Sequence, residues 1–376
     1  MREEDEWEIY DRWLFLRKLL FSWFFTFQYS DINSEVKDKI AEKDPAMFAT
    51  LESNVWKKLE TLDLSSGIKQ DIKRIQEESK EDIVLSFAKV WASFYEIYNN
   101  SLVYPDAYAR ILKNIIKKSE KSEFQQFLKY LDFDPHNQTD IERYLLVIHR
   151  LASSFRWNRS VRRYPVSVLS HTYIIAFFSY IVWHENNLPD EHITDMLLTA
   201  LFHDIPEAIT GDIITPTKKS VPGLEEMIEH IERDMIYEHL LSYLTGNTFQ
   251  EAYAKKMLKP WDESHWALVK SADILSAYHE ALLEAGFKDE DIDGSWVPYK
   301  PVGCSACNNG YKGRVGIYQV MPISEEIQRI ILRDGSALEI AEQARNEGVR
   351  SLRESGLHKV KMGSTSLEEV LAVTNE

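Results

Sequence analysis

The stretch HDIPEAITGDIITPTK, residues 203–218, gathers polar and ionisable side chains directly after an apolar segment, DMLLTALF, residues 195–202. The apolar segment has the spacing of a helix, so the stretch begins where that helix is expected to end. Because a His-Asp dipeptide arises often by chance, the inference of a functional site depends on the residues that accompany it. The residues of interest in this stretch are His203, Asp204, Glu207, Asp212 and Lys218.

Two further candidates lie in other apolar helices. His171 opens a long apolar run, and Asp273 is flanked by apolar neighbours, where a carboxylate is costly to bury unless it meets a cation. With His203 and Asp204 they form a mixed nitrogen and oxygen donor set, which suits Mn²⁺, Co²⁺, Fe²⁺, Ni²⁺ or Zn²⁺ better than Ca²⁺. The sequence thus predicts one divalent-metal site. Each residue alone could equally be a hydrogen-bonded core residue.

The whole pattern resembles the HD-domain phosphohydrolases, and within them the YfbR-type 5'-deoxynucleotidases. Those proteins carry an Arg-Trp pair, a His, the run H-D-x-x-E-x-x-x-G-D-x-x-x-P-x-K and a distant Asp, in an all-helical fold. The resemblance covers about residues 140–283, and every motif position is filled. The matching residues are Arg156, Trp157, His171, His203, Asp204, Glu207, Gly211, Asp212, Pro216, Lys218 and Asp273.

The resemblance implies metal-dependent hydrolysis of a phosphomonoester, with deoxyribonucleoside 5'-monophosphates as the expected substrates. A cation suits this chemistry because it activates its water and stabilises charge on the phosphate. Glu207 would orient or deprotonate the attacking water, and Asp212 would protonate the leaving oxygen or contact the sugar. Arg156 and Lys218 would anchor the phosphate. Trp157 would pack against the sugar or base, or serve only the core.

Some alternatives stay open. Pro206 stands between Asp204 and Glu207, where a proline can end the helix and turn Glu207 off the expected face. A guanosine tetraphosphate hydrolase or a dNTP triphosphohydrolase would use the same kinds of ligand, although the T-G-D…P-x-K run argues against both. The cyclic-di-GMP branch carries a Gly-Tyr-Pro signature, which this sequence lacks.

Composition changes sharply at Gly286, because ten of the fourteen glycines and both cysteines lie from there onward. Residues 286–376 resemble the C-terminal end of type IV pilus assembly and type II secretion ATPases. The chain contains no G-x-x-x-x-G-K-[ST] loop, so we expect no ATP site. That family binds zinc through two C-x-x-C pairs, and Cys304 and Cys307 supply only one. The pair is either a zinc half-site completed by another chain or by His, or reduced and vacant.

Before Gly286 the pattern is helical almost throughout, as in residues 7–28, where apolar side chains recur on one helical face. We therefore predict a mainly α protein in three parts. These are a helical N-terminal bundle at 1–139, an all-α HD domain at 140–285 and a small α+β C-terminal module at 286–376. Nothing in the first part carries recognisable chemistry.

Forty-four basic against sixty acidic residues give a formal charge of -16, which repels phosphate backbones and disfavours nucleic acid as a partner. The longest apolar runs fall short of the roughly 20 residues of a membrane span, and the acidic N-terminus does not look like a secretory signal. We predict a cytoplasmic protein that binds a small-molecule nucleotide. The alternative is a non-catalytic interaction or regulatory protein that reaches pilus-assembly partners through residues 286–376. Homo-oligomer formation is left open.

Overall fold

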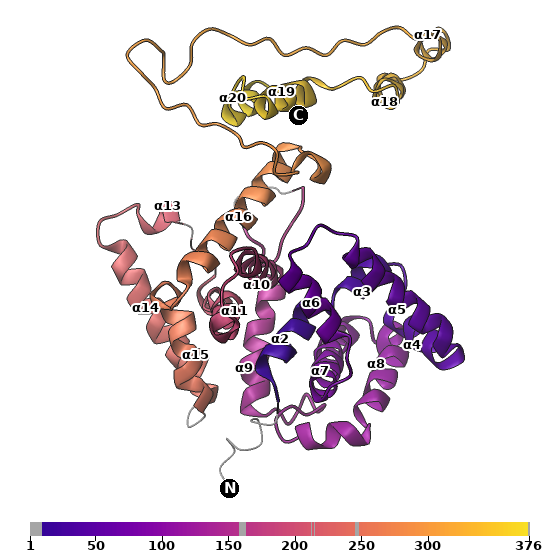
Figure 1. Ribbon diagram of the computed structural model, residues 1–376, viewed down its shortest axis with the longest axis vertical. Helices are drawn as coiled ribbons and strands as arrows, with labels where there is room; N and C mark the ends of the chain where they lie inside the picture. Colours follow the sequence, from indigo (N-terminus) through magenta and orange to yellow (C-terminus); the bar gives the residue numbers. More distant parts are fainter. Residues whose placement is uncertain (1–9, 158–162, 212, 214, 245–247, 375–376) are drawn as a thin grey trace. The chain divides into compact units, whose positions relative to one another are not determined.

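The computed structural model describes residues 10–157, 163–211, 213, 215–244 and 248–374. The described residues form two compact units, both built from helices (Figure 1). The first unit contains the described residues up to Ser276, except Arg163 and Tyr164. Those two residues and everything from Ala277 onward form the second unit. The division falls inside one long helix, α16 (Trp266–Ala285).

The first helices of the first unit begin at capping residues that can be recognised in the sequence. Asp11, Asn33, Asp44 and Ser65 each precede a helix, and each side chain accepts a backbone N–H from its first turn. The elements in order are α2 (Arg12–Phe21), α3 (Phe24–Gln28), α4 (Ser34–Lys43), α5 (Pro45–Glu60), α6 (Ser66–Ile75), α7 (Lys80–Val103), α8 (Pro105–Ser119) and the 3₁₀ helix η1 (Ser122–Phe127).

The same unit continues with the segments that carry the candidate site. The elements are α9 (Asp140–His149), η2 (Arg150–Ala152), α10 (Val168–Glu185), η3 (Asp190–His192), α11 (Ile193–Phe202), α12 (Glu207–Thr210), α13 (Thr215–Lys218), α14 (Leu224–His239), η4 (Leu241–Leu244), α15 (Thr248–Leu258), η5 (Pro260–Asp262) and the first part of α16. Helix α10 is apolar on nearly every side, which is typical of a helix surrounded by others. It is the central helix of the unit's largest core.

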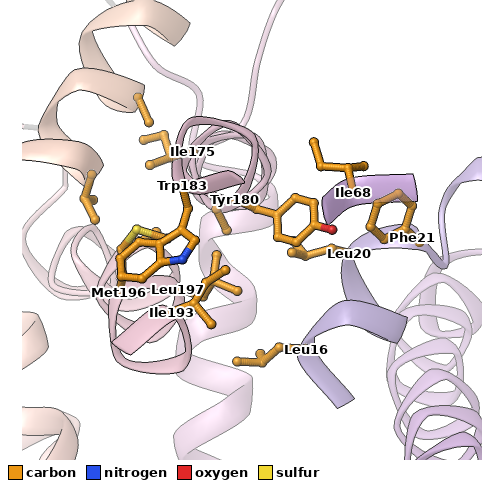
Figure 2. Packing of buried hydrophobic residues seen from close by; sticks show 14 of the residues in the cluster. Leu16, Leu20, Phe21, Ile68, Ile175, Tyr180, Trp183, Ile193, Met196 and Leu197 are labelled. Atoms are coloured by element: carbon orange, nitrogen blue, oxygen red, sulfur yellow. The ribbon is translucent and has the colours of Figure 1, made fainter. Parts of the chain in front are cut away.

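That core joins the N-terminal helices to the helices of the candidate site. Tyr180 and Trp183 on α10 are fully buried, and Figure 2 shows Leu20 and Phe21 of α2 among the residues packed around them. Complete burial of an apolar side chain of this size contributes about 1.5–3 kcal/mol. The predicted domain limits 1–139 and 140–285 stay a prediction. The structure adds that helices on either side of residue 140 share one core.

A buried charge network ties the same helices together. Arg17 on α2 pairs with Asp71 on α6 (Nε to Oδ2, 3.1 Å) and with Asp190 in η3 (2.9 Å). The hydroxyl of Tyr180 donates to Asp71 at 3.0 Å, and His184 Nε2 lies 3.2 Å from the same oxygen. Because a buried charge is costly without partners, this network fixes how α2, α6 and α10 pack.

The second unit has a much smaller core. It contains the end of α16, η6 (Asp289–Asp291), α17 (Glu325–Leu332), α18 (Ala337–Asn346), α19 (Leu352–Lys361) and α20 (Leu367–Val373). The hydrophobic cluster of this unit contains the buried residues Leu282, Ala285, Phe287, Leu357, Val360 and Val370. These side chains hold the end of α16 against α19 and α20.

The prediction of a mainly α protein is confirmed, but the α+β character of the C-terminal module is not shown. Between Ile292 and Ser324 the described chain has only one isolated bridge, between Asn308 and Tyr311, and no strand. A strand needs a neighbouring strand for its backbone groups. In this segment the β-prone residues Tyr318 and Val320 are instead exposed. Across the described residues, none of the helices combines the length and apolar character that crossing a membrane requires.

Candidate metal centre

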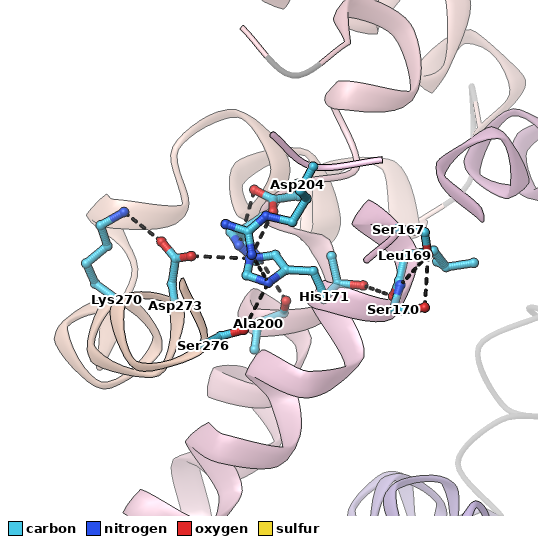
Figure 3. Close-up of polar contacts among 12 residues, drawn as sticks. Ser167, Leu169, Ser170, His171, Ala200, Asp204, Lys270, Asp273 and Ser276 are labelled. Carbon is cyan, nitrogen blue, oxygen red and sulfur yellow. Dashed lines mark hydrogen bonds and ion pairs between the residues drawn. The ribbon is translucent and has the colours of Figure 1, made fainter. Parts of the chain in front are cut away.

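His171 lies in the first turn of α10. The helix begins because Ser167 caps it, accepting the backbone N–H of Ser170 at 3.1 Å. The imidazole is fully buried, which makes its polar partners decisive. Its Nδ1 lies 3.2 Å from Oγ of Ser276 and also contacts the guanidinium of Arg156. Its Nε2 points toward two carboxylates (Figure 3).

His203 and Asp204 stand where α11 ends. Helix α11 stops at Phe202, and Pro206 then serves as the N-cap of the short helix α12. The His203 Nδ1–H donates to the carbonyl of Ala200 at 2.8 Å, and this hydrogen bond holds the ring with Nε2 turned toward Asp204. A backbone carbonyl that fixes the ring in this way is the usual support of a metal-binding imidazole.

Asp273 comes from the third helix, α16. One of its oxygens, Oδ1, lies 3.2 Å from His171 Nε2, and the other accepts a hydrogen bond from Lys270 at 2.8 Å. Lys270 and Asp273 are three residues apart and so lie on one face of the helix. The carboxylate therefore bridges the centre and a lysine nearer the surface.

Three of the four predicted ligands, His171, His203 and Asp204, lie together, and the fourth, Asp273 on α16, contacts His171. His171 Nε2 lies 3.7 Å from Asp204 Oδ2, and His203 Nε2 lies 3.1 Å from Asp204 Oδ1. One ligand atom from each of His171, His203 and Asp204 lies within 4.8 Å of the others, and Asp273 contacts His171. Two nitrogens and carboxylate oxygens at this spacing fit one borderline divalent cation. Their role as ligands stays a prediction.

Electrostatics in the centre favour charged carboxylates. Burial raises the pKa of Asp204, but His203 and His171 outweigh it, and the pKa falls below its ordinary value. The pKa of Asp273 is also lowered, because hydrogen bonds from His171 and Lys270 outweigh burial. Burial lowers the pKa of His203, yet the Asp204 carboxylate raises it overall. A cation binding here would take over the role of that proton.

The other predicted site residues are less tightly grouped. Glu207 begins α12, its backbone N–H donates to the Asp204 carbonyl at 3.1 Å, and it lies outside the three-residue metal-competent group. Trp157 is 42% exposed with a positive φ of 58°, next to Arg156. Lys218 pairs with Glu232 on α14 at 3.2 Å. Asp212 lies outside the described residues.

The cysteine pair, Cys304 and Cys307, has fewer contacts than the centre at His171. The Cys304 N–H donates to Sγ of Cys307 at 2.8 Å, in an exposed part of the second unit. The pKa of the Cys307 thiol is lowered by hydrogen bonds from Cys304. Within the described part of the chain, the metal-competent group is the one at His171, and the cysteines have no third ligand there. The zinc half-site stays a prediction.

The sequence interpretation missed three residues of the centre. Ser276 faces His171, Lys270 bonds to Asp273, and the Trp261 ring lies 5.8 Å from the His203 ring, centroid to centroid. The spacing of Lys270 and Ser276, three residues on either side of Asp273, was a usable signal because it puts them on one helical face. Trp261 precedes α16 in η5 and carries no such signal.

Two family models match different parts of the chain. Residues 143–293 match the family model described as 5'-deoxynucleotidase YfbR-like, and residues 271–372 match that of the type II/IV secretion system proteins. Both resemblances drawn from the sequence are thereby confirmed for these parts of the chain. The first match supports a hydrolase of the HD phosphohydrolase kind. The second fits a pilus-linked C-terminal module, and the two matches overlap within and just after α16.

Curated relatives match chiefly the C-terminal region. The type IV pilus assembly ATPase PilB of Pseudomonas aeruginosa is 55% identical over 97 residues, 26% of this chain and 17% of that protein. PilB of Thermus thermophilus is 44% identical over 98 residues, 26% of this chain and 11% of that protein. Type II secretion system protein E of Xanthomonas campestris is 26% identical over 175 residues, 46% of this chain and 28% of that protein. The chain thus spans less than a third of the length of each of these relatives.

Proposed function

We propose that the chain is a metal-dependent phosphohydrolase that removes phosphate from deoxynucleoside or nucleoside 5'-monophosphates. The observation that carries the proposal is the convergence of His171, His203, Asp204 and Asp273. The donor set fits a divalent cation because the His203 ring is held with Nε2 toward the centre and both carboxylates have lowered pKa values. The nucleotide substrate is inferred from the match to the YfbR-like family.

In this proposal the four residues hold one cation, and the chain supplies the rest. When bound, the cation would lower the pKa of a water and offset negative charge on the phosphate. Arg156, whose guanidinium already contacts His171, would donate hydrogen bonds to phosphate oxygens. Glu207, one turn beyond Asp204, would orient the attacking water and accept its proton.

The remaining roles follow the motif. Asp212 would donate a proton to the leaving 5'-oxygen or bind the sugar. Trp157, which is exposed beside Arg156, would pack against the sugar or base. Lys218 would serve as a phosphate anchor only after leaving Glu232, so we expect it to contribute less than Arg156. The cation would be one of Mn²⁺, Co²⁺, Fe²⁺, Ni²⁺ and Zn²⁺.

The test is phosphate release from dAMP, dGMP, dCMP, dTMP and dUMP by the full chain loaded with Mn²⁺ or Co²⁺. We expect turnover by the loaded protein, and loss of both bound metal and turnover in Asp204→Ala. A matched control is Asp234→Ala, which removes an exposed carboxylate on α14 and should change neither. A metal-loaded protein that releases no phosphate from these or from ribonucleotides would refute the proposal.

A second candidate function is docking to the pilus-assembly machinery. It is favoured by large apolar side chains that the second unit exposes, among them Val302 (97% exposed), Leu338 (82%) and Leu332 (77%). Exposed apolar surface of this kind is typical of interaction sites. The partner chemistry is inferred from the similarity to PilB.

Copurification of the full chain with a type IV pilus assembly ATPase tests the second candidate. We expect Leu332→Lys to reduce capture. The matched control is Met227→Lys, which changes an exposed apolar residue on α14 of the first unit and should not affect capture. Equal capture of both variants, or no capture of the wild type, would exclude docking through this surface.

A further inference from the structure

The open side of the metal centre can be identified from the exposure of its side chains. The two histidine side chains are buried, at 1% and 2% exposure, whereas those of Asp204 and Asp273 are 22% and 17% exposed. Farther out, the Lys270 side chain is 41% exposed and Trp261 is 37% exposed. Exposure thus rises from the histidines through the carboxylates to Lys270 and Trp261. Lys270 and Trp261 are therefore the outermost residues of this chain of contacts.

Lys270 is held in place rather than free to move in solvent. Its ammonium donates to Asp273 Oδ2 at 2.8 Å, while the other oxygen of the same carboxylate faces His171 (Figure 3). The ammonium also lies 4.6 Å from the centroid of the Trp261 ring, within range of a cation–π contact. One carboxylate therefore separates the lysine from the metal centre.

Trp261 connects the lysine to the opposite ligand. It comes from η5, between α15 and α16, and its ring stands at 60° to the His203 ring with centroids 5.8 Å apart. The indole thus contacts His203 with one part of its surface and Lys270 with another. The cation–π contact with Trp261 and the ion pair with Asp273 together hold Lys270 at the edge of the centre. A lysine that is already held in place loses less conformational entropy when it binds an anion.

Charge balance favours a positively charged side chain beside the metal centre. Two carboxylates neutralise a divalent cation, so a phosphate monoester with a charge of about −1.5 to −2 needs further positive charge. Lys218 pairs with Glu232, which is not a predicted ligand, whereas Arg156 contacts the predicted ligand His171 and Lys270 contacts the predicted ligand Asp273. Arg156 and Lys270 therefore flank the centre through two different ligands.

We propose that Lys270 binds the phosphate group of the substrate, positioned for this by Asp273 and Trp261. The inference rests on the proposed phosphohydrolase function and adds a binding residue to it. The ammonium acts as a point charge with rotatable donors, so it can keep one hydrogen bond to Asp273 while giving another to a phosphate oxygen.

The affinity for phosphate distinguishes two roles of Lys270, direct binding of the phosphate group and support of Asp273. The experiment titrates the Mn²⁺-loaded full chain with inorganic phosphate by calorimetry, and measures bound metal in the same samples. Calorimetry is preferable to intrinsic fluorescence because the chain has ten tryptophans. The variants are Lys270→Ala, Lys270→Arg and the control Lys255→Ala, a partly exposed lysine whose ion partner is Glu263.

We expect Lys270→Ala to keep its metal and to bind phosphate roughly tenfold or more weakly, the loss typical of a charge-assisted hydrogen bond. Lys270→Arg should recover most of the affinity, and Lys255→Ala should match the wild type. In nucleotide hydrolysis Lys270→Ala should raise KM more than it lowers kcat.

Three results would overturn the inference. Unchanged phosphate affinity in a metal-loaded Lys270→Ala protein would show that the lysine does not touch the anion. Loss of metal from that variant would show that it acts through Asp273. If the metal-loaded wild type failed to bind phosphate, Lys270 would have no anion to bind. Nucleotide turnover by the wild type in any of these cases would leave the proposed function standing, so the two failures can be told apart.

Discussion

The two units of this protein are both helical, yet the hydrophobic cores that they build differ greatly in size. In the first unit Tyr180, Trp183 and Met196 are fully buried in one large core. In the second, the core has only six buried residues, while Val302 and Leu338 are almost completely exposed. The first unit can therefore hold charged groups in fixed positions, and the second offers apolar surface to other molecules.

This difference explains why the two candidate metal sites differ so much. His171 lies on the same buried helix as Trp183, so packing fixes its position before any cation arrives. Cys304 and Cys307 lie in an exposed segment without helices and hold chiefly each other. Rigid support, more than the presence of ligand-type residues, separates the two.

The largest effect is expected from Trp183→Ala, which empties part of the core packed around α10, the helix that also carries His171. Removing a fully buried tryptophan costs about 3–5 kcal/mol of unfolding free energy. Urea denaturation measures the loss, and bound Mn²⁺ should fall with it because α10 also carries His171. Full stability with an intact metal content would contradict the idea that this core supports the centre.

Arg17→Met tests whether α2 belongs to the same core. The side chain is 2% exposed and pairs with Asp71 and Asp190, so its loss leaves the buried Asp71 carboxylate without its guanidinium, with only Tyr180 and His184 beside it. We expect a loss of about 3 kcal/mol or more in unfolding free energy. The control Arg74→Met removes a half-exposed partner of Asp11 and should cost less than about 1 kcal/mol.

If instead both arginine variants lost the same small unfolding free energy, α2 would be an accessory helix. The domain boundary predicted near residue 140 would then gain support. Denaturation curves with a single transition for both variants keep the comparison valid.

Leu357→Ala provides the matched change in the second unit. Leu357 is 4% exposed and packs in the small core with Leu282 and Val360. We expect a loss of about 2–3 kcal/mol, felt only in the transition of this unit, with metal content and phosphate release unchanged. A fall in bound metal would show that the two units are coupled, and would break the contrast drawn above.

The helical fold and the convergence of the candidate ligands were the parts most open to prediction. Hydrophobic periodicity reports helices directly. The His171, His203, Asp204 and Asp273 pattern resembles a family motif, so their meeting in space could be expected although no spacing rule joins three distant helices. Helix α11 ends at Phe202 and α12 begins after Pro206, while the effect of this proline on the face that Glu207 presents stays a prediction.

Other features depend on tertiary packing and left little trace in the sequence. Which helix packs on which cannot be read from periodicity, so the core shared by α2 and α10 was missed. Trp261 reaches the centre from a short 3₁₀ turn, where no periodic signal exists. The strands expected after Gly286 are absent from the described residues, because a β-prone sequence makes a strand only beside a partner.

The smallest effect on stability is expected from Leu338→Lys. Its side chain is 82% exposed on α18, and a surface substitution away from caps and core contacts changes the unfolding free energy by no more than about 0.5 kcal/mol. If this surface serves a partner, the same variant should weaken capture by a pilus assembly ATPase while its denaturation curve overlays that of the wild type. A marked loss of stability would instead mean that Leu338 is covered within the free protein. The contrast between the large core of the first unit and the exposed apolar side chains of the second would then fail at Leu338.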